Sequence, residues 1–158
     1  MTRIQRSALV QHSAGYMYGL VGDVLSYPDF LPWCTGVSIL EQTDRVVQAR
    51  VQIKRGGVGI SFVTCNCMQP EERIEITLKE GPFSALHGLW VFQPLAEDAC
   101  KVSLDLQVEI KNLLLRSTVG RMFEQVANTM VEAFCGRADE LAGGSLSRLA
   151  DHDANGRV

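Results

Sequence analysis

The sequence predicts an α+β fold in which one curved antiparallel sheet of about seven strands wraps around a long C-terminal helix. Apolar residues alternate with period two from residue 37 to residue 110, and with a helical period from residue 112 to residue 141. Only short turns separate the strands, which excludes parallel crossovers of a dozen or more residues. A chain of 158 residues is the length of one domain, and it can bury a substantial core.

The sequence pattern of the N-terminal segment predicts a strand followed by a glycine-rich helix. Residues 2–10 read as a short strand, and Ser13 is a candidate N-cap for the helix. The apolar positions of this helix recur at helical spacing, at Met17, Leu20, Val21 and Val24. Three glycines each cost such a helix about 1 kcal/mol relative to alanine. We therefore expect tertiary packing to hold it, or a close backbone approach at Gly15, Gly19 and Gly22.

An apolar segment bounded by prolines follows this helix at residues 26–36. Pro28 and Pro32 disfavour a regular helix there, although the segment is rich in large apolar side chains. We expect an apolar loop or a short helical turn.

The strands of the central segment each have one apolar face. In the last of them, Val102, Leu104 and Leu106 alternate with charged and polar residues, so only one face of the sheet should be buried. The predicted strands are residues 37–43, 45–55, 59–69, 73–79, 86–95 and 100–110.

The long helix is expected to cover the apolar face of the sheet, which gives a helix-grip outline with an internal hydrophobic cavity. Its predicted stripe is Leu115, Val119, Met122, Val126, Met130, Ala133 and Phe134. Gly143 and Gly144 are expected to end it. The predicted division is a ligand-binding domain at residues 1–141 and a flexible polar tail at residues 142–158.

Composition and charge narrow the class of protein. The formal net charge is -3, which argues mildly against nonspecific nucleic-acid binding. No apolar stretch is long enough to cross a membrane, and the N-terminus lacks the apolar core of a signal peptide. The five cysteines are odd in number and scattered, as expected for free thiols in the cytoplasm.

Basic side chains nevertheless cluster in two places. These basic residues form either an ordinary solvated surface or a small basic patch. Its members are Arg45, Arg50, Lys54 and Arg55 in one hairpin, and Lys111, Arg116 and Arg121 leading into the long helix.

A set of large apolar side chains could line the predicted cavity or serve as plain core. Asn66 and Thr64 also point to the apolar face, where they need hydrogen-bond partners from a ligand, the backbone or a buried water. The candidate ligand-binding residues are Tyr27, Phe30, Trp33, Phe62, Asn66, Phe83, Trp90, Phe92, Met122, Val126 and Met130.

Signals of catalysis are weak. His12, His87 and His152 are isolated in the sequence, and Cys65 and Cys67 share a strand face without a nearby cluster of metal ligands. We expect no catalytic residue, no metal and no required cofactor.

Three segments carry a resemblance to a known family: SYPDFLPWCTG at 26–36, GPFSALHGLWVFQPL at 81–95 and GRMFEQVANTMVEAF at 120–134. Over about residues 3–140 the chain resembles the START-like (Bet v 1-like) superfamily. Within it, the chain resembles the branch of mitochondrial coenzyme Q-binding proteins and bacterial RatA-type ribosome-association toxins. The resemblance implies a helix-grip fold whose cavity binds a long apolar ligand, with ubiquinone or another polyprenyl quinone as the expected ligand.

For bacterial members, the resemblance also implies binding to the large ribosomal subunit, a block of subunit association and a small ubiquitin-like partner protein. Members of the branch commonly carry basic residues where this chain has Cys65 and Ser84, which weakens a role that depends on phosphate binding.

Our leading hypothesis is therefore a non-enzymatic ubiquinone carrier that supports respiration or quinone synthesis, with peripheral contact to the inner membrane. The alternatives are the ribosome-association toxin and, by fold analogy alone, a polyketide cyclase-like enzyme.

Overall fold

The computed structural model describes the backbone of residues 2–153 and the side chains of residues 2–143. An N-terminal strand and helical segment precede the meander, and a helical region ends the chain. The elements are β1 (Thr2–Val10), α1 (Ala14–Gly22), η1 (Val24–Ser26), α2 (Tyr27–Phe30), β2 (Cys34–Gln42), β3 (Val46–Arg55), β4 (Val58–Gln69), β5 (Arg73–Glu80), β6 (Ala85–Ala96), β7 (Ala99–Glu109), α3 (Leu113–Leu115), η2 (Arg116–Gly120) and α4 (Arg121–Asp153).

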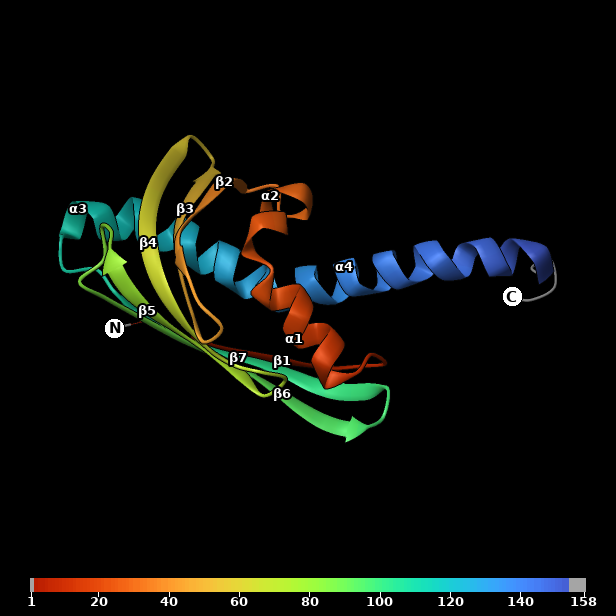
Figure 1. Ribbon diagram of the computed structural model, residues 1–158. Helices are drawn as coiled ribbons and strands as arrows, with labels where there is room; N and C mark the ends of the chain where they lie inside the picture. Colours follow the sequence, from red (N-terminus) through yellow and green to blue (C-terminus); the bar gives the residue numbers. More distant parts are fainter. Residues whose placement is uncertain (1, 154–158) are drawn as a thin grey trace.

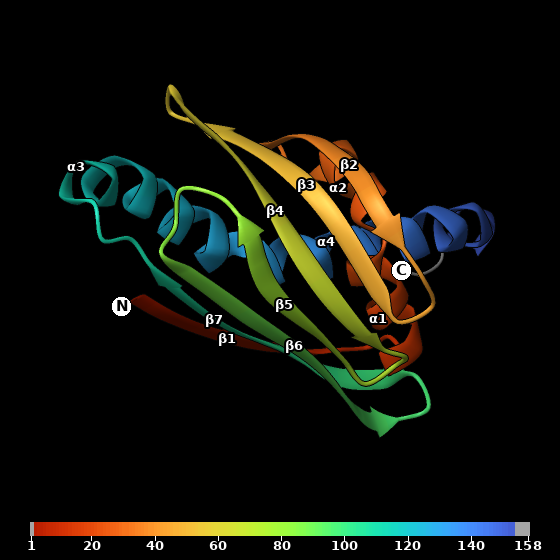
Figure 2. The same cartoon turned by 60° about the vertical axis from the view of Figure 1, so that its left-hand side comes forward.

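All seven strands form one antiparallel sheet, in the order β1-β7-β6-β5-β4-β3-β2. Strands β2 to β7 are the predicted meander, and β1 joins it by pairing with β7. The sheet is strongly curved, and the long helix α4 lies along its concave side (Figures 1 and 2). The predicted α+β helix-grip architecture is confirmed.

Burial alternates along the strands as the sequence pattern predicts. In β7 the side chains of Cys100, Val102, Leu104, Leu106 and Val108 are buried, while those between them are partly exposed. The same alternation in β3 and β6 gives the sheet one buried, concave face. Burying each large apolar side chain contributes about 1.5–3 kcal/mol, so this face is the main source of stability.

The helical region begins at Asn112, whose side-chain oxygen accepts hydrogen bonds from the backbone N–H groups of Leu114 (2.9 Å) and Leu115 (3.3 Å). A single π-helical stretch, η2, then connects α3 to α4. The buried stripe is wider than predicted and includes Phe123, Ala127 and Val131. The curved sheet reaches around both sides of α4, so residues flanking the expected stripe are buried as well.

The C-terminal end of α4 differs from the prediction. The helix passes through Gly143 and Gly144 and continues to Asp153. A helical glycine costs only about 1 kcal/mol relative to alanine, and no proline follows to force a stop. The predicted tail at residues 142–158 is therefore helical up to Asp153. The prediction that this tail is flexible concerns the side chains of residues 144–153 and the residues 154–158, which lie outside the described part of the chain.

The proline-bounded segment forms η1 and α2, the short helical turn that was one of the two expectations. Strand β2 begins at Cys34, three residues before the predicted start. One of the three glycines in α1 marks a close approach: a Cβ atom at Gly22 would lie 2.9 Å from Met68 Cε. No described helix contains a stretch that is both long and apolar enough to cross a bilayer.

Candidate functional site

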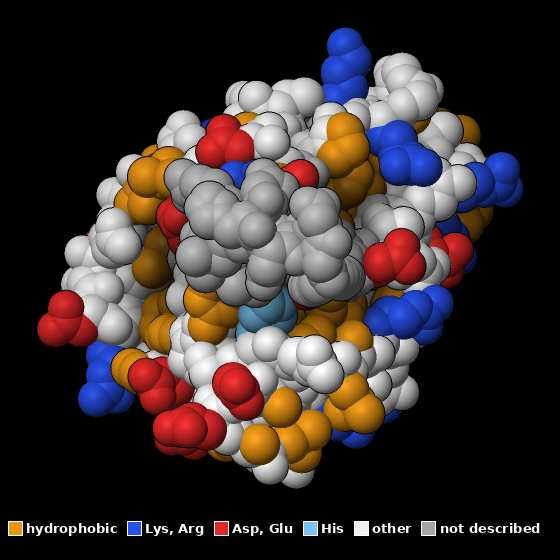
Figure 3. All heavy atoms as spheres, turned by 90° about the vertical axis from the view of Figure 1, so that its right-hand side faces the viewer, with side chains coloured by type: hydrophobic (Ala, Val, Ile, Leu, Met, Phe, Trp, Pro, Cys, Tyr) orange, Lys and Arg blue, Asp and Glu red, His pale blue; other side chains and the backbone are white. Residues whose placement is uncertain are grey.

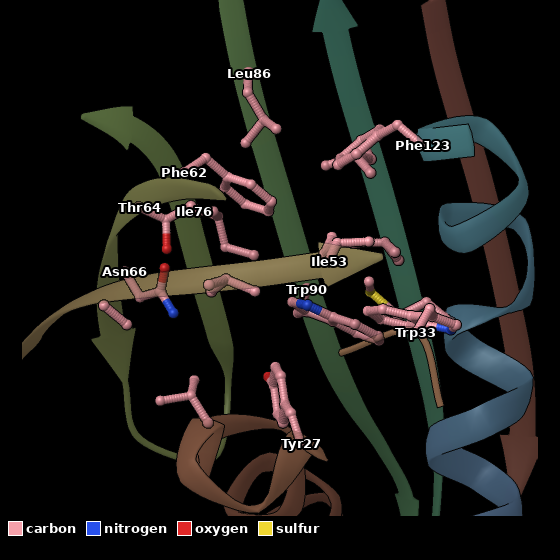
Figure 4. A pocket seen from close by; sticks show the side chains of 16 residues that line it. Tyr27, Trp33, Ile53, Phe62, Thr64, Asn66, Ile76, Leu86, Trp90 and Phe123 are labelled. Atoms are coloured by element: carbon pink, nitrogen blue, oxygen red, sulfur yellow. The ribbon is translucent and has the colours of Figure 1, made fainter. Parts of the chain in front are cut away.

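A cavity of about 90 Å³ lies between the concave face of the sheet, the α2 segment and α4. Its walls are formed almost entirely by apolar side chains, most of them from strands β3 to β7, and Figure 4 shows the labelled side chains pointing toward one another. The lining residues are Val24, Tyr27, Trp33, Ala49, Val51, Ile53, Phe62, Thr64, Asn66, Ile76, Leu86, Trp90, Leu104, Leu106, Phe123 and Met130.

The structure brings together about half of the side chains predicted to bind a ligand. The predicted residues that line the cavity are Tyr27, Trp33, Phe62, Asn66, Trp90 and Met130. The predicted residues outside its wall are Phe30, Phe83, Phe92, Met122 and Val126. Alternation identified the correct face of the sheet, but it did not say which part of that face packs against a neighbour.

The five residues outside the wall pack against other core side chains. Phe83 lies between Phe62 and Phe123, with ring centroids 5.6 Å and 5.0 Å away. Phe92 stacks beside Trp90, with centroids 6.3 Å apart. Phe30 packs against Phe134, at 5.3 Å. Met122 and Val126 are buried in the core without reaching the cavity wall.

The largest wall residue that sequence reasoning missed is Phe123. It falls beside the predicted stripe of the helix, and only the curvature of the sheet makes its position internal. The smaller missed residues, such as Ala49, Leu104 and Leu106, were on strand faces predicted to be buried. Preferring aromatic side chains caused these aliphatic positions to be left out.

Two polar side chains interrupt the apolar wall. Thr64 and Asn66 are neighbours on the inner face of β4, with 6% and 7% of their surface exposed. Within the described residues, Asn66 Oδ1 has no hydrogen-bond partner. Both side chains project toward the cavity in Figure 4. The cavity therefore presents hydrogen-bonding groups at Asn66 and Thr64 in an otherwise largely apolar wall.

Another polar group in the wall is already bonded. The Tyr27 hydroxyl donates to the backbone carbonyl of Val21, and burial raises the pKa of this hydroxyl. This bond fixes α2 against the end of α1. It leaves Asn66 as the better candidate for a ligand contact.

The cavity volume limits what can bind without rearrangement. A cavity of about 150 Å³ is known to hold benzene, so 90 Å³ is too small for a substituted quinone ring. An apolar ligand with a ring would require α2 or α4 to move. The geometry alone suits a small apolar group with one polar atom.

The predicted basic patch is divided between different parts of the surface. Arg45 lies in the turn between β2 and β3, and Arg50 lies 4.0 Å from the Glu80 carboxylate. Arg121 lines grooves on both sides of η2, one shared with Arg55 and the other with Arg116. The basic residues that remain together, Arg55, Arg116 and Arg121, therefore lie at the end of the molecule that carries α3.

The two positions where the chain departs from the family resemblance have different surroundings. Ser84 links two elements: its hydroxyl accepts a hydrogen bond from Lys111 N (3.1 Å), and its own N–H donates to Glu109 O (2.7 Å). It thereby fixes the connection from β7 to α3. Cys65 lies on β4 and is only partly buried.

Possible catalytic side chains occur as separate pairs. His12 Nε2 is 2.7 Å from Asp139 Oδ1, and His87 Nε2 is 2.7 Å from Glu75 Oε2. These pairs belong to different parts of the fold. Within the described residues, no three His, Cys, Asp or Glu side chains are grouped to hold a metal ion.

All five cysteines are free thiols, as predicted. Burial raises the pKa of Cys34, Cys100 and Cys135, which disfavours their reactive thiolate forms.

Residues 10–135 match the protein family described as polyketide cyclase / dehydrase and lipid transport. The chain belongs to this family. Among curated members, it is 44% identical over 142 residues to "Ribosome association toxin RatA" of Pseudomonas aeruginosa, covering 90% of this chain and 99% of that protein. It is 27% identical over 141 residues to the mitochondrial "Coenzyme Q-binding protein COQ10 homolog B" of Xenopus laevis, covering 87% of this chain and 58% of that protein.

Solved structures share the fold of this chain. A START superfamily protein from Mycobacterium smegmatis matches with a TM-score of 0.70 and 24% identity, over 88% of this chain and 98% of its own. The Zhui aromatase/cyclase from Streptomyces matches with a TM-score of 0.74 and 17% identity, over 99% of both chains. The expected START-like resemblance is confirmed, and the curated relatives favour the ribosomal alternative over the leading ubiquinone hypothesis.

Proposed function

We propose that this protein is a ribosome-association toxin of the RatA type, which acts in the cytoplasm by binding the large ribosomal subunit and preventing subunit joining. The observation that carries the proposal is the 44% identity to the Pseudomonas aeruginosa relative, over nearly the whole length of both chains. The coenzyme Q-binding relative is far more distant in sequence, with 27% identity over 141 residues.

The cations at the α3 end supply a surface for ribosomal RNA. Lys54, Arg55, Lys111, Arg116 and Arg121 are all exposed. Among residues 2–143, none of these five cations forms an ion pair, because all the ion pairs involve other cations. Because no carboxylate neutralises them directly, these side chains can contact RNA phosphates.

The proposed action is occupancy of the subunit interface rather than turnover of a substrate. This interpretation rests on the names of the relatives, which describe a toxin and a binding protein. The separate His–carboxylate pairs are consistent with it, since neither is joined to a nucleophile. The small ubiquitin-like partner protein stays a prediction.

The test is a sucrose-gradient profile of ribosomal subunits incubated with purified protein at several salt concentrations. A variant with Arg55→Gln, Arg116→Gln and Arg121→Gln should lose most of its effect on subunit joining, because it removes three phosphate contacts. A matched variant with Arg45→Gln, Arg73→Gln and Lys101→Gln removes the same charge from other parts of the surface and should retain the effect. Equal activity of the two variants would contradict the assignment of the α3 end as the RNA-binding surface. Inactivity of the unmodified protein would contradict the proposed function.

A second function is supported by the cavity. Its apolar wall with the unpartnered Oδ1 of Asn66 suits an apolar ligand with a polar head, such as ubiquinone or another polyprenyl lipid. We propose this carrier role as the alternative, with α2 or α4 moving to admit the ligand.

The carrier role is tested by solvent extraction and mass spectrometry of lipid that co-purifies with the protein. Val126 is unsuitable for a blocking substitution, because it is core outside the cavity wall and a charge there would disrupt folding. Ala49→Leu instead fills the cavity from β3 with an apolar side chain. Quinone bound to the unmodified protein and to an exposed Ala96→Leu control, but absent from Ala49→Leu, would support the role. Equal amounts in all three would contradict it.

A further inference from the structure

The most exposed large apolar side chain of the described chain belongs to α3, together with its sequence neighbour. Leu114 is 81% exposed and Leu113 is 72% exposed. The backbone that presents them is ordered by the Asn112 cap, which bonds to the N–H groups of Leu114 and Leu115. Leu115 packs against the core and anchors the turn. Two adjacent leucines are therefore held outward at a fixed position.

Figure 1 shows α3 at one extreme of the molecule, at the far end from the C-terminal part of α4. Because every neighbouring pair of strands is antiparallel, the β3–β4 and β5–β6 turns lie at this same end. Arg55 ends β3 beside the β3–β4 turn, and it lines a groove together with Thr118 of η2 and Arg121 of α4. The leucines thus project from a surface that also presents cations.

Charge is distributed unequally between the two ends. Around α3, the exposed cations Lys54, Arg55, Lys111, Arg116 and Arg121 outnumber the carboxylates Glu80, Glu109 and Glu124. The opposite ends of the strands carry acidic turns. Their exposed carboxylates are Asp44, Glu71, Glu72, Glu97 and Asp98, and these outnumber the cations of the same turns and adjoining strand ends, Arg45, Arg73 and Lys101. Figure 3 looks from the side opposite α3: carboxylates gather at the lower left of this view, and Lys and Arg side chains lie mainly along its right side. The molecule is therefore polarised, with its α3 end directed toward negative surfaces.

We propose that the α3 end docks on the surface of an anionic lipid bilayer. Leu113 and Leu114 enter the boundary between headgroups and acyl chains, while Lys111, Arg116 and Arg55 contact lipid phosphates. A bilayer satisfies both halves of this surface, because it offers an apolar phase directly beneath a layer of negative charge. RNA phosphates would attract the cations but would leave the two leucines in water. The two exposed leucines are therefore the part of this surface that a bilayer can use and RNA phosphates cannot.

This inference goes beyond the proposed function and does not depend on it, since vesicle binding is measured with the protein alone. The two activities share Arg55 and Arg116, so a bilayer and a ribosomal subunit cannot occupy this end together. The leucines separate them: removing the leucines should affect the bilayer alone, whereas removing the arginines should affect both.

The test is co-sedimentation with vesicles of phosphatidylcholine, with and without phosphatidylglycerol. We expect binding only to vesicles that contain the anionic lipid, with weaker binding at high salt because screening shortens the reach of the cations. The double variant Leu113→Ser and Leu114→Ser should bind at least tenfold more weakly. The control variant Leu9→Ser and Leu95→Ser removes two other exposed leucines, 73% and 53% exposed, and should bind normally. Equal binding of the two variants, or no binding of the unmodified protein, would overturn the proposal.

A second measurement locates the docked residue. In a Leu114→Trp variant, the added indole should shift its emission to shorter wavelength on anionic vesicles, because it leaves water. Leu95→Trp should show no shift. If the serine variant at Leu113 and Leu114 instead loses its effect on ribosomal subunits while vesicle binding is unchanged, the leucines serve the ribosome and the bilayer proposal is wrong.

Discussion

The indole of Trp90 meets the ring of Phe134 edge to face, with ring centroids 5.4 Å apart and planes at 88°. Trp90 comes from β6 and Phe134 from α4, so this contact joins the sheet to the helix that it surrounds. Both side chains are almost fully buried, and Tyr27 and Phe30 of α2 pack against the same phenylalanine. One aromatic ring therefore holds three parts of the fold together.

Phe134→Ala is expected to lower the free energy of unfolding by about 3–5 kcal/mol, because it leaves a cavity at the junction of sheet, α2 and α4. Urea unfolding followed by tryptophan fluorescence measures this loss. Leu114→Ala serves as the control and should change stability by less than about 0.5 kcal/mol, since its side chain is exposed. A loss below about 1 kcal/mol for Phe134→Ala would contradict the anchoring role.

Asn66→Leu is expected to stabilise the protein by about 1 kcal/mol. Asn66 Oδ1 is buried without a partner among the described residues, and an unpaired buried polar group costs about 1–3 kcal/mol. Leucine has a similar volume and suits the apolar wall. Thermal unfolding monitored by circular dichroism would show the rise in Tm. A clear decrease instead would mean that the amide is hydrogen-bonded in solution.

Gly81→Ala is expected to lower the free energy of unfolding by about 1–3 kcal/mol through overpacking. A Cβ atom at this position would lie 2.7 Å from Phe62 Cβ, and Phe62 is held by Phe83 and Phe123. Gly59→Ala is the matched control, because the nearest atom to its new methyl group is 3.8 Å away. Similar unfolding midpoints in urea for these two variants would show that β4 can shift to accommodate the methyl group.

The ion pair between Arg3 and Asp105 is expected to make stability depend on pH at the acidic end. The Arg3 guanidinium hydrogen-bonds both carboxylate oxygens, at 3.0 Å and 2.7 Å, and lowers the pKa of Asp105. A lowered carboxyl pKa adds stability above the unfolded value of about 3.9, and this contribution disappears as the pH falls through the folded value.

This contribution is measured by comparing Asp105→Asn with the unmodified protein in urea at pH 7 and at pH 2. The variant should be slightly less stable at pH 7, and the difference should vanish at pH 2. Asp98→Asn, in the β6–β7 turn, is the control and should match the unmodified protein at both values. A difference for Asp105→Asn that persists at pH 2 would assign the effect to packing rather than to charge.

Local sequence patterns determined most of the secondary structure. Alternation in segments such as residues 100–110 fixed which face of each strand is buried, because successive side chains of a strand point to opposite sides. The predicted cap at Ser13 is confirmed, since its hydroxyl accepts a hydrogen bond from Tyr16 N at 3.0 Å. The predicted end of α4 at Gly143 and Gly144 was wrong. A helical glycine costs little, so the residues around it decide whether the helix continues.

The sequence by itself determined the fold class, the strand faces, the position of the long helix and the family, all of which follow from periodicity or from residues close together in the chain. Only the tertiary structure decided that Phe123 lines the cavity while Val126 does not, and that Arg55 and Arg121 share a groove far from Arg45. It also decided that no described part of the chain covers Leu113 and Leu114. These outcomes depend on how far the sheet curves around α4. That curvature is set by the packing of all seven strands together, so no local pattern contains it.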